Sequence, residues 1–184
     1  GDNVAAIYWD IQKFYDSIAV HKLIDLALDL EYPILLMAMG LQVHLAPRVL
    51  QAGGHSSKGT HTSNSILAGC TQSNAFARAC LHRTLSDVHE RVPRVFIRQF
   101  VDDLAQRGEG DTNTVIEDSV AAAVEIAASL TRSRLVISAK STVVGSSARI
   151  TNAIVTELGK VGIPITTAQS TRDLGIDASS GKRR

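Results

Sequence analysis

The stretch that most constrains the fold is residues 96–107, which reads FIRQFVDDLAQR. Successive side chains of a β-strand point to opposite faces, so Phe96, Arg98 and Phe100 would share one face of an extended chain. Residues 95, 97, 99 and 101 would share the other face. Asp102 and Asp103 fall between the two extended halves. We therefore predict a β-hairpin whose tip carries two adjacent carboxylates.

A third carboxylate stands near the start of the chain. Residues 5–9 (AAIYW) suit a buried strand, and that strand ends in Asp10. Asp10 can meet Asp102 and Asp103 if the strands are neighbours in one sheet. Carboxylates held in a tight turn repel each other, so such a group is most at ease around a divalent cation. The alternative is a solvated Asp-Asp turn, because Asp is a common turn residue.

The residue types indicate which cation would suit this group. Three oxygen ligands without a neighbouring His or Cys favour Mg²⁺ or Mn²⁺ over Zn²⁺.

With three further stretches, these residues resemble the reverse transcriptases, and most nearly those of non-LTR retrotransposons and group II introns. Order and spacing both agree, and the resemblance covers the chain from Ala5 to Ile176. Residues 10–16 resemble motif A of that family, 65–73 motif B, 100–103 the aromatic-x-Asp-Asp of motif C, 138–141 the lysine-bearing motif D, and 171–176 the Leu-Gly segment near the primer grip.

The resemblance implies an RNA-directed DNA polymerase that uses an RNA template, a DNA primer and deoxynucleoside triphosphates. It also implies an α+β polymerase palm, a ferredoxin-like antiparallel sheet with helices on one face. Parts of the fingers and the start of the thumb would adjoin it. On this basis we expect one domain over residues 1–184, with the palm in about 1–140 and the post-palm segment in about 141–184.

The resemblance also assigns roles to individual residues. Two ions, Mg²⁺ or Mn²⁺, would be held by Asp10, Asp102 and Asp103, with the backbone carbonyl of Ile11 as an added ligand. Lys140 would lie near the pyrophosphate leaving group, and Tyr15 would contact the incoming sugar and exclude a 2′-hydroxyl. The remaining expected contacts are Gly69 and Gln72 with the nucleotide, and Leu174 and Gly175 with the nucleic acid.

The sequence departs from the family in two places. Motif B usually has Pro-Gln before its glycine, and here Leu67 and Ala68 stand there. Gln72 is the residue that could substitute from the following helix. The chain also starts almost at motif A, without the upstream strands of the fingers, so we expect a fragment. The alternative function is therefore a non-catalytic, retroelement-derived nucleic-acid-binding domain that keeps the palm fold.

Charge is distributed unevenly along the chain. The net charge is +1, but residues 1–50 sum to −3 and residues 51–100 to +4. We expect the phosphate contacts in this middle segment, at Lys58, Arg78 and Arg83, with Arg91, Arg94 and Arg98 as further candidates. The alternative for each of them is a solvated helix surface.

Length and composition set the broad class. With 184 residues, 45% of them hydrophobic, the chain can form one cored domain. No apolar run approaches the roughly 18 residues of a membrane span and no leader precedes Ala5, so we expect a soluble intracellular protein without a membrane partner. A eukaryotic retroelement would place it in the nucleus. No protein partner is indicated, and Cys70 and Cys80 suit packing roles.

Apolar spacing predicts helices over residues 17–28, from Pro33 onward, over 71–90, after 112, and over 149–158. Asp16 or Ser17 would cap the first helix, and Thr112 or Asn113 the fourth. The helix after Pro33 would bury Leu35, Leu36, Met37 and Leu41, with Met39 also in the core. We expect a turn over 53–60, strands over 135–137 and 142–144, and a final extended segment after 163.

Overall fold

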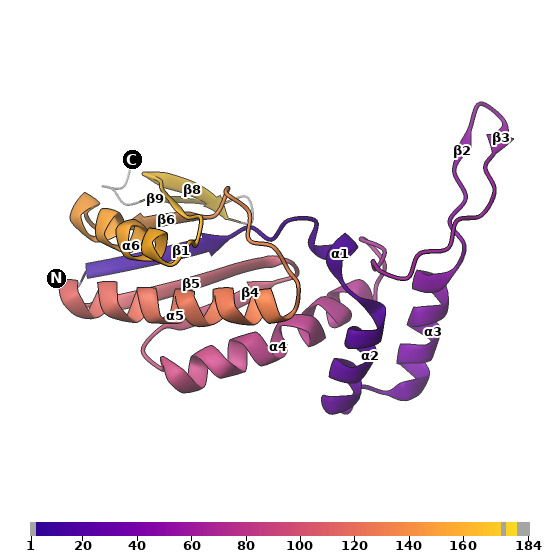
Figure 1. Ribbon diagram of the computed structural model, residues 1–184, viewed down its shortest axis with the longest axis horizontal. Helices are drawn as coiled ribbons and strands as arrows, with labels where there is room; N and C mark the ends of the chain where they lie inside the picture. Colours follow the sequence, from indigo (N-terminus) through magenta and orange to yellow (C-terminus); the bar gives the residue numbers. More distant parts are fainter. Residues whose placement is uncertain (1–2, 174–175, 180–184) are drawn as a thin grey trace. The chain divides into compact units, whose positions relative to one another are not determined.

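The computed structural model describes residues 3–173 and 176–179. Contacts divide the chain into two compact units, which we call the sheet unit (residues 1–12 and 82–184) and the helical unit (residues 13–81). Helix α4 (Ser73–Arg91) contributes its first half to the helical unit and its second half to the sheet unit. Helices and a sheet are both present, as the predicted α+β class requires (Figure 1).

The main sheet of the sheet unit has the strand order β4-β5-β1-β6-β7. These strands are β4 (Phe96–Phe100), β5 (Asp103–Gly110), β1 (Asn3–Trp9), β6 (Thr142–Gly145) and β7 (Thr166–Thr167). Four of them pair antiparallel, as predicted, but β7 runs parallel to β6, so the prediction of a purely antiparallel sheet is wrong. The reason is that helix α6 (Ala148–Lys160) connects β6 to β7 as a crossover, which returns the chain in the same direction.

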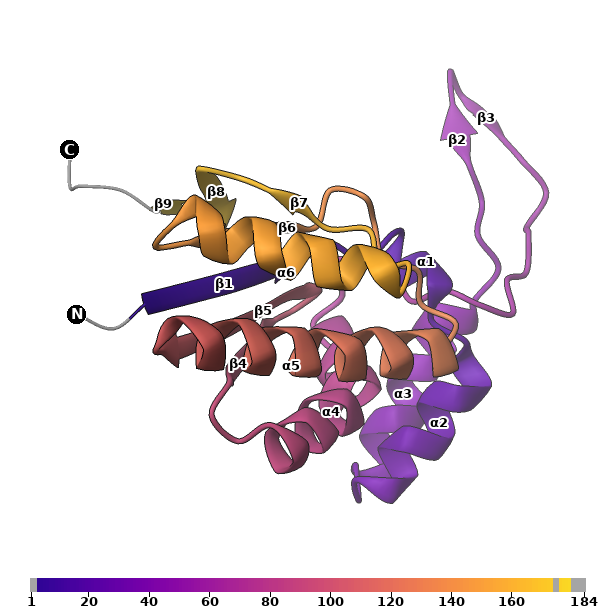
Figure 2. The ribbon, with the colours of Figure 1, turned by 60° about the vertical axis from the view of Figure 1, so that its left-hand side comes forward.

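Two helices cover one face of this sheet, α5 (Thr112–Arg132) and α6 (Figures 1 and 2). α5 packs on β1 and β5, α6 packs on β6 and β7, and the two helices pack on each other. Because side chains alternate along a strand, β1 buries Ala5, Ile7 and Trp9 beneath the helices. The helices supply Val115, Ala122, Ile126, Leu130, Ile150, Ile154 and Leu158 to the same core.

A buried polar residue fixes α5 on the sheet. Gln106 of β5 is only 1% exposed, and its side chain is satisfied at both ends. Its Oε1 accepts from the indole N–H of Trp9 at 3.3 Å, and its Nε2 donates to the backbone carbonyl of Ser119 at 2.8 Å. A buried amide with both groups paired specifies one arrangement of strand and helix, because any other would leave a polar group unsatisfied.

The helical unit begins with α1 (Phe14–Ser17), α2 (Val20–Asp29) and α3 (Ile34–Leu45). A small hairpin follows, β2 (Gln51–Ala52) with β3 (His55–Ser56), and then the first half of α4. Gly53 and Gly54 form the hairpin turn at φ +55° and +79°, so the turn predicted over 53–60 is confirmed at its start, whereas His55 and Ser56 belong to β3. Leu23, Phe76 and His44 are among the fully buried side chains of this unit.

The predicted buried face of α3 is confirmed at Met37 and wrong at Leu35, Leu36 and Met39, while Leu41 is half-buried. Met37, Gly40 and His44 are buried, whereas Leu35 is 80% exposed, Leu36 is 47% exposed and Met39 is 63% exposed. The helix is apolar on nearly all sides, so periodicity alone cannot select the side that packs.

Several predicted boundaries also move. Neither Asp16 nor Ser17 caps α2, because both lie in the separate short helix α1 and α2 follows Ala19 without a side-chain cap. Asp111 caps α5, one residue before the predicted position, and accepts from the backbone N–H groups of Asn113 and Thr114. Residues 135–137 form only a single bridge, between Ile11 and Ile137, instead of a strand.

The remaining strands are β8 (Ser170–Asp173) and β9 (Ile176–Ser179), which pair antiparallel with each other. None of the helices in the described ranges combines the length and the apolar character needed to cross a bilayer.

Candidate functional site

The two adjacent aspartates lie where the sequence predicts, at the tip of the β4–β5 hairpin. The strand register pairs Phe100 with Asp103, which leaves Val101 and Asp102 as a two-residue turn. Val101 has φ +59°, a left-handed conformation that a β-branched residue adopts only under strain. The side-chain amide of Gln99 donates to the carbonyl of Val101 at 2.7 Å and helps to hold this turn. Strain of this kind, about 1–3 kcal/mol, is typical of functional loops.

Asp10 is brought to the same end of the sheet by β1. Strand β1 pairs with β5 up to Trp9 opposite Leu104, so the next position in the same register sets Asp10 opposite Asp103. The backbone of Asp10 is bonded on its other side to residues 138–141. Its N–H donates to Ser141 Oγ at 3.0 Å, and its carbonyl accepts from the N–H of Ser138 at 2.8 Å. These bonds hold the backbone of Asp10 while its side chain remains exposed.

The three carboxylates influence one another electrostatically. The pKa of Asp103 lies above its ordinary value, first because of partial desolvation at the hairpin tip and then because of the charges of Asp102 and Asp10. Because the charges of Asp102 and Asp10 act on Asp103, a cation at this end of the sheet would be favourable. Asp10 and Asp103 are exposed and Asp102 is half-buried, so all three can be reached from solvent.

The donor set consists of oxygens alone, which fits Mg²⁺ or Mn²⁺. Across the part of the chain that is described, no three His, Cys, Asp or Glu side chains are already gathered closely enough to hold an ion. The charges of Asp10 and Asp102 therefore affect the ionisation of Asp103, but the three carboxylates do not form a closed ligand cluster.

Ile11 and Lys140 lie next to this group in the chain or in the fold. Ile11 is buried, and the bonds from Gln12 to Val136 and from Ser138 to Asp10 flank its bridge to Ile137. Its own carbonyl therefore points away from residue 137, on the side where the hairpin lies. Lys140 is exposed in the 138–141 turn that holds Asp10, and its N–H donates to Ser138 Oγ at 3.1 Å.

Tyr15 lies in the helical unit and is half-buried, whereas its neighbour Phe14 is only 3% exposed. The two rings meet edge to face with centroids 5.5 Å apart. Tyr15 is also bonded to the stretch that resembles motif B, because its carbonyl accepts from the N–H of Ile66 at 3.0 Å. A second bond, from the N–H of Ser65 to the carbonyl of Ile18, joins the same two segments.

Gly69 and Gln72 have different surroundings. Gly69 is exposed with φ +84°, and a Cβ placed there would meet nothing within 4 Å, so the backbone conformation, and not packing, favours glycine. Gln72 is half-buried, and its side-chain oxygen lies against Gly40 of α3 without a hydrogen-bond partner.

The predicted basic contacts fall into two groups. Lys58, Arg78 and Arg83 are exposed. Arg91 and Arg94, by contrast, form ion pairs with α5, to Glu125 at 2.6 Å and to Asp118 at 2.7 Å. Leu174 and Gly175 lie outside the described residues.

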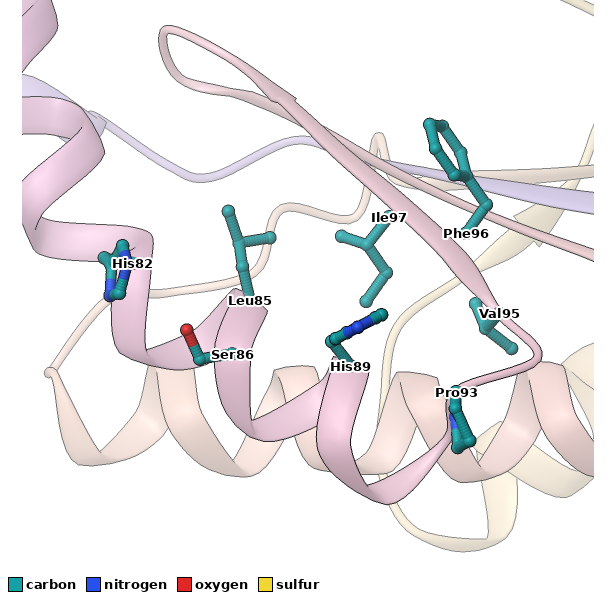
Figure 3. A pocket seen from close by; sticks show the side chains of 8 residues that line it. All are labelled: His82, Leu85, Ser86, His89, Pro93, Val95, Phe96 and Ile97. Carbon is teal, nitrogen blue, oxygen red and sulfur yellow. The ribbon is translucent and has the colours of Figure 1, made fainter.

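A pocket of about 460 Å³ opens between the second half of α4 and strand β4 (Figure 3). His82, Ser86 and His89 line it from one face of α4, and Val95 and Ile97 line it from the other side. None of the residues predicted to be functional borders this pocket. Spacing of i, i+4 and i+7 along α4 is the sequence signal that places the first three together.

Comparison with protein-family models finds no match, and comparison with curated proteins finds no significant relative. The class is therefore defined by the structure itself, a mixed α+β chain with a five-stranded mixed sheet and helices on one of its faces.

Proposed function

We propose that this chain is the palm part of an RNA-directed DNA polymerase that transfers nucleotides from deoxynucleoside triphosphates to a primer. The observation that carries the proposal is the convergence of Asp10 with the Asp102–Asp103 hairpin tip. Two adjacent strands bring these acids to one end of the sheet, and partial burial followed by the charges of Asp102 and Asp10 raises the pKa of Asp103. Structural ion pairs do not explain the arrangement, because all three groups carry the same sign.

Asp10 and Asp102 would hold two Mg²⁺ or Mn²⁺ ions, with Asp103 and the carbonyl of Ile11 completing the oxygen ligands. Bound there, the ions would lower the pKa of the primer 3′-hydroxyl and stabilise the leaving pyrophosphate. Asp10 is well placed for this role, because its backbone is fixed by Ser138 and Ser141 while its carboxylate remains free to turn. Lys140, in the same turn, would supply positive charge toward the pyrophosphate.

Further residues of the helical unit and of α4 would contact the nucleotide and the nucleic acid. Tyr15 would contact the sugar, and its bond to Ile66 links it to the turn that contains Gly69. Lys58, Arg78 and Arg83 would contact phosphates of the RNA template and DNA primer, because they are exposed.

A second candidate is a non-catalytic nucleic-acid-binding domain that keeps the palm fold. Two observations favour it: the open arrangement of the three carboxylates and the replacement of Pro-Gln by Leu67 and Ala68.

Primer extension separates the two functions. A longer version of the protein that includes the upstream fingers is incubated with an RNA template, a DNA primer, deoxynucleotides and Mg²⁺ or Mn²⁺. The polymerase proposal predicts extension that Asp102→Asn abolishes and that Asp25→Asn, which alters an exposed carboxylate of the helical unit, leaves intact. Tight binding of the primer–template without extension by the wild-type protein would favour the non-catalytic function.

A further inference from the structure

The turn that contains Leu67, Ala68 and Gly69 is held at a single residue by two side chains of the helical unit. The backbone N–H of Leu67 donates to Nδ1 of His44 at 2.8 Å. The carbonyl of Leu67 accepts a hydrogen bond from Ser73 Oγ. His44 lies in α3 and Ser73 begins α4, so side chains of two helices are hydrogen-bonded to the same residue of the turn.

His44 is suited to this contact in only one protonation state. Its side chain is fully buried, with the ring of Phe76 edge-on at 5.5 Å between centroids. A backbone N–H can only donate, so Nδ1 must carry its lone pair and the imidazole proton must be on Nε2. Nε2 itself is buried and has no hydrogen-bond partner in the structure. The ring is therefore neutral, and its one satisfied nitrogen is the one that holds Leu67.

The backbone at both ends of the turn is in the left-handed region. Ser65 has φ +88° and Gly69 has φ +84°. Ser65 is not glycine, so its conformation persists only because neighbours fix it. Its N–H donates to the carbonyl of Ile18, and its Oγ accepts from Arg48 Nη2 at 3.0 Å. Leu67 takes part in no strand or helix, and the backbone bond of the turn itself runs from the N–H of Cys70 to the carbonyl of Leu67 at 3.3 Å. The contacts from His44 and Ser73 add to this one backbone bond.

We propose that His44 and Ser73 are positioning residues that set the shape of the Leu67–Gly69 turn, and that His44 does so only as a neutral imidazole. If the proposed polymerase function holds, this is the turn that meets the incoming nucleotide, so that part of the inference rests on that function. The two hydrogen bonds that hold Leu67, to His44 Nδ1 and from Ser73 Oγ, do not depend on the polymerase function, and we call this pair of bonds the clamp.

Protonation of His44 would break the clamp. A proton on Nδ1 would set one N–H against another, so the imidazolium cannot accept from Leu67. Burial, followed by the charge of Arg48, holds the pKa of His44 below its ordinary value, which keeps the clamp closed at neutral pH. Asp16 of α1 is a further charged group of this network, with its Oδ1 3.5 Å from Ser65 Oγ, and α4 faces His44 with the uncharged Phe76.

Amide hydrogen exchange at Leu67, followed by NMR from pH 8 down to the onset of acid unfolding, tests the hydrogen bond from Leu67 to His44. We expect the protection factor of the Leu67 amide to be constant near neutral pH. At pH values below the lowered pKa of His44 it should decrease by about tenfold per pH unit, as for one linked proton. His44→Asn supplies an amide oxygen that accepts at every pH, so protection should persist without the pH dependence. His44→Leu and Ser73→Ala should lose protection throughout, while helix amides of α2 keep theirs.

A wild-type protection factor that does not change with pH would overturn the inference, as would a His44→Asn variant that behaves like His44→Leu. If His44→Leu does not fold, the ring-nitrogen shifts of wild-type His44 decide, since the clamp requires the Nε2–H tautomer. In a protein active in primer extension, His44→Leu should raise the KM for the nucleotide more than it lowers kcat, and His44→Asn should restore it. Exchange behaviour as predicted without any extension would leave the clamp standing and refute the polymerase proposal.

Discussion

Asp10 and Asp103 face each other across the end of the β1–β5 ladder, and the charge of Asp10 contributes to the raised pKa of Asp103. They are 93 positions apart in the chain, with all of the helical unit's sequence between them, and the register of β1 and β5 brings them together. The charge of Asp10 opposes the ionisation of Asp103, so an ionised Asp103 is unfavourable for folding unless a cation is bound.

The first prediction concerns the pH dependence of stability. A carboxyl group whose pKa is raised by folding destabilises the fold when it is ionised, so its unfavourable effect appears as the pH rises from the ordinary value of 3.8 through the raised pKa. Asp103→Asn should therefore have a higher Tm than the wild type at pH 7, and the difference should vanish near pH 3. Thermal unfolding at both pH values measures it.

Asp25→Asn provides the control, because Asp25 is an exposed carboxylate of the helical unit. A Tm that rises equally in both variants would mean that general charge reduction, and not the opposition of Asp10 and Asp103, causes the effect.

The second prediction tests which side of α3 packs. Met37 is 7% exposed and Met39 is 63% exposed, although the two residues are of one type and two positions apart. Met37→Ala should lower the free energy of unfolding by about 2–5 kcal/mol, as expected for a buried side chain. Met39→Ala should change it by no more than about 0.5 kcal/mol. Urea denaturation of the two variants decides, and equal losses would show that the helix packs on a different side.

The third prediction uses Phe14 and Tyr15 as a matched pair. Phe14 is buried and Tyr15 is half-buried, so Phe14→Ala should cost about 3–5 kcal/mol of stability and Tyr15→Ala clearly less. If Tyr15 excludes the 2′-hydroxyl, Tyr15→Ala should also raise the kcat/KM for ribonucleotides relative to deoxyribonucleotides. An unchanged ratio in a folded, active Tyr15→Ala protein would show that Tyr15 does not exclude the 2′-hydroxyl. It would leave the proposed role of the three aspartates untouched.

The fourth prediction separates arginines that are available to phosphate from arginines used within the fold. Binding to an RNA–DNA duplex should weaken with salt by roughly one power of concentration per neutralised phosphate. Arg83→Gln should lower that slope by about one. Arg91→Gln should change it little, because Arg91 is paired with Glu125 on α5. Fluorescence anisotropy across a salt series measures both slopes, and identical slopes in the two variants would contradict the assignment.

The hairpin and its acids could be predicted from sequence because their signals are local. Alternation over residues 96–107 specifies the strands, and Asp102 and Asp103 stand at the only break between them. The meeting of Asp10 with the tip then follows if β1 and β5 are neighbours, which the register confirms.

Other features depend on contacts that no local pattern contains. Ser141 holds Asp10 from 131 positions away, and serine is too common for its position to indicate this. Helix α3 is apolar on nearly every side, so its packed face is decided by Phe76 and Gln72, which lie against Gly40. No local sequence pattern indicates a role for His44, because that role depends on Leu67, which lies 23 residues further along the chain.

The most direct test of the account is whether Asp10, Asp102 and Asp103 bind one set of cations. Mn²⁺ is titrated into the protein and the bound fraction is followed by electron paramagnetic resonance, in the wild type and in Asp10→Asn, Asp102→Asn and Asp25→Asn. The account predicts saturable binding that falls at least about tenfold, or about 1.4 kcal/mol, in each of the first two variants and is unchanged in the third. Equal Mn²⁺ affinity in the wild type, Asp10→Asn and Asp102→Asn would contradict it.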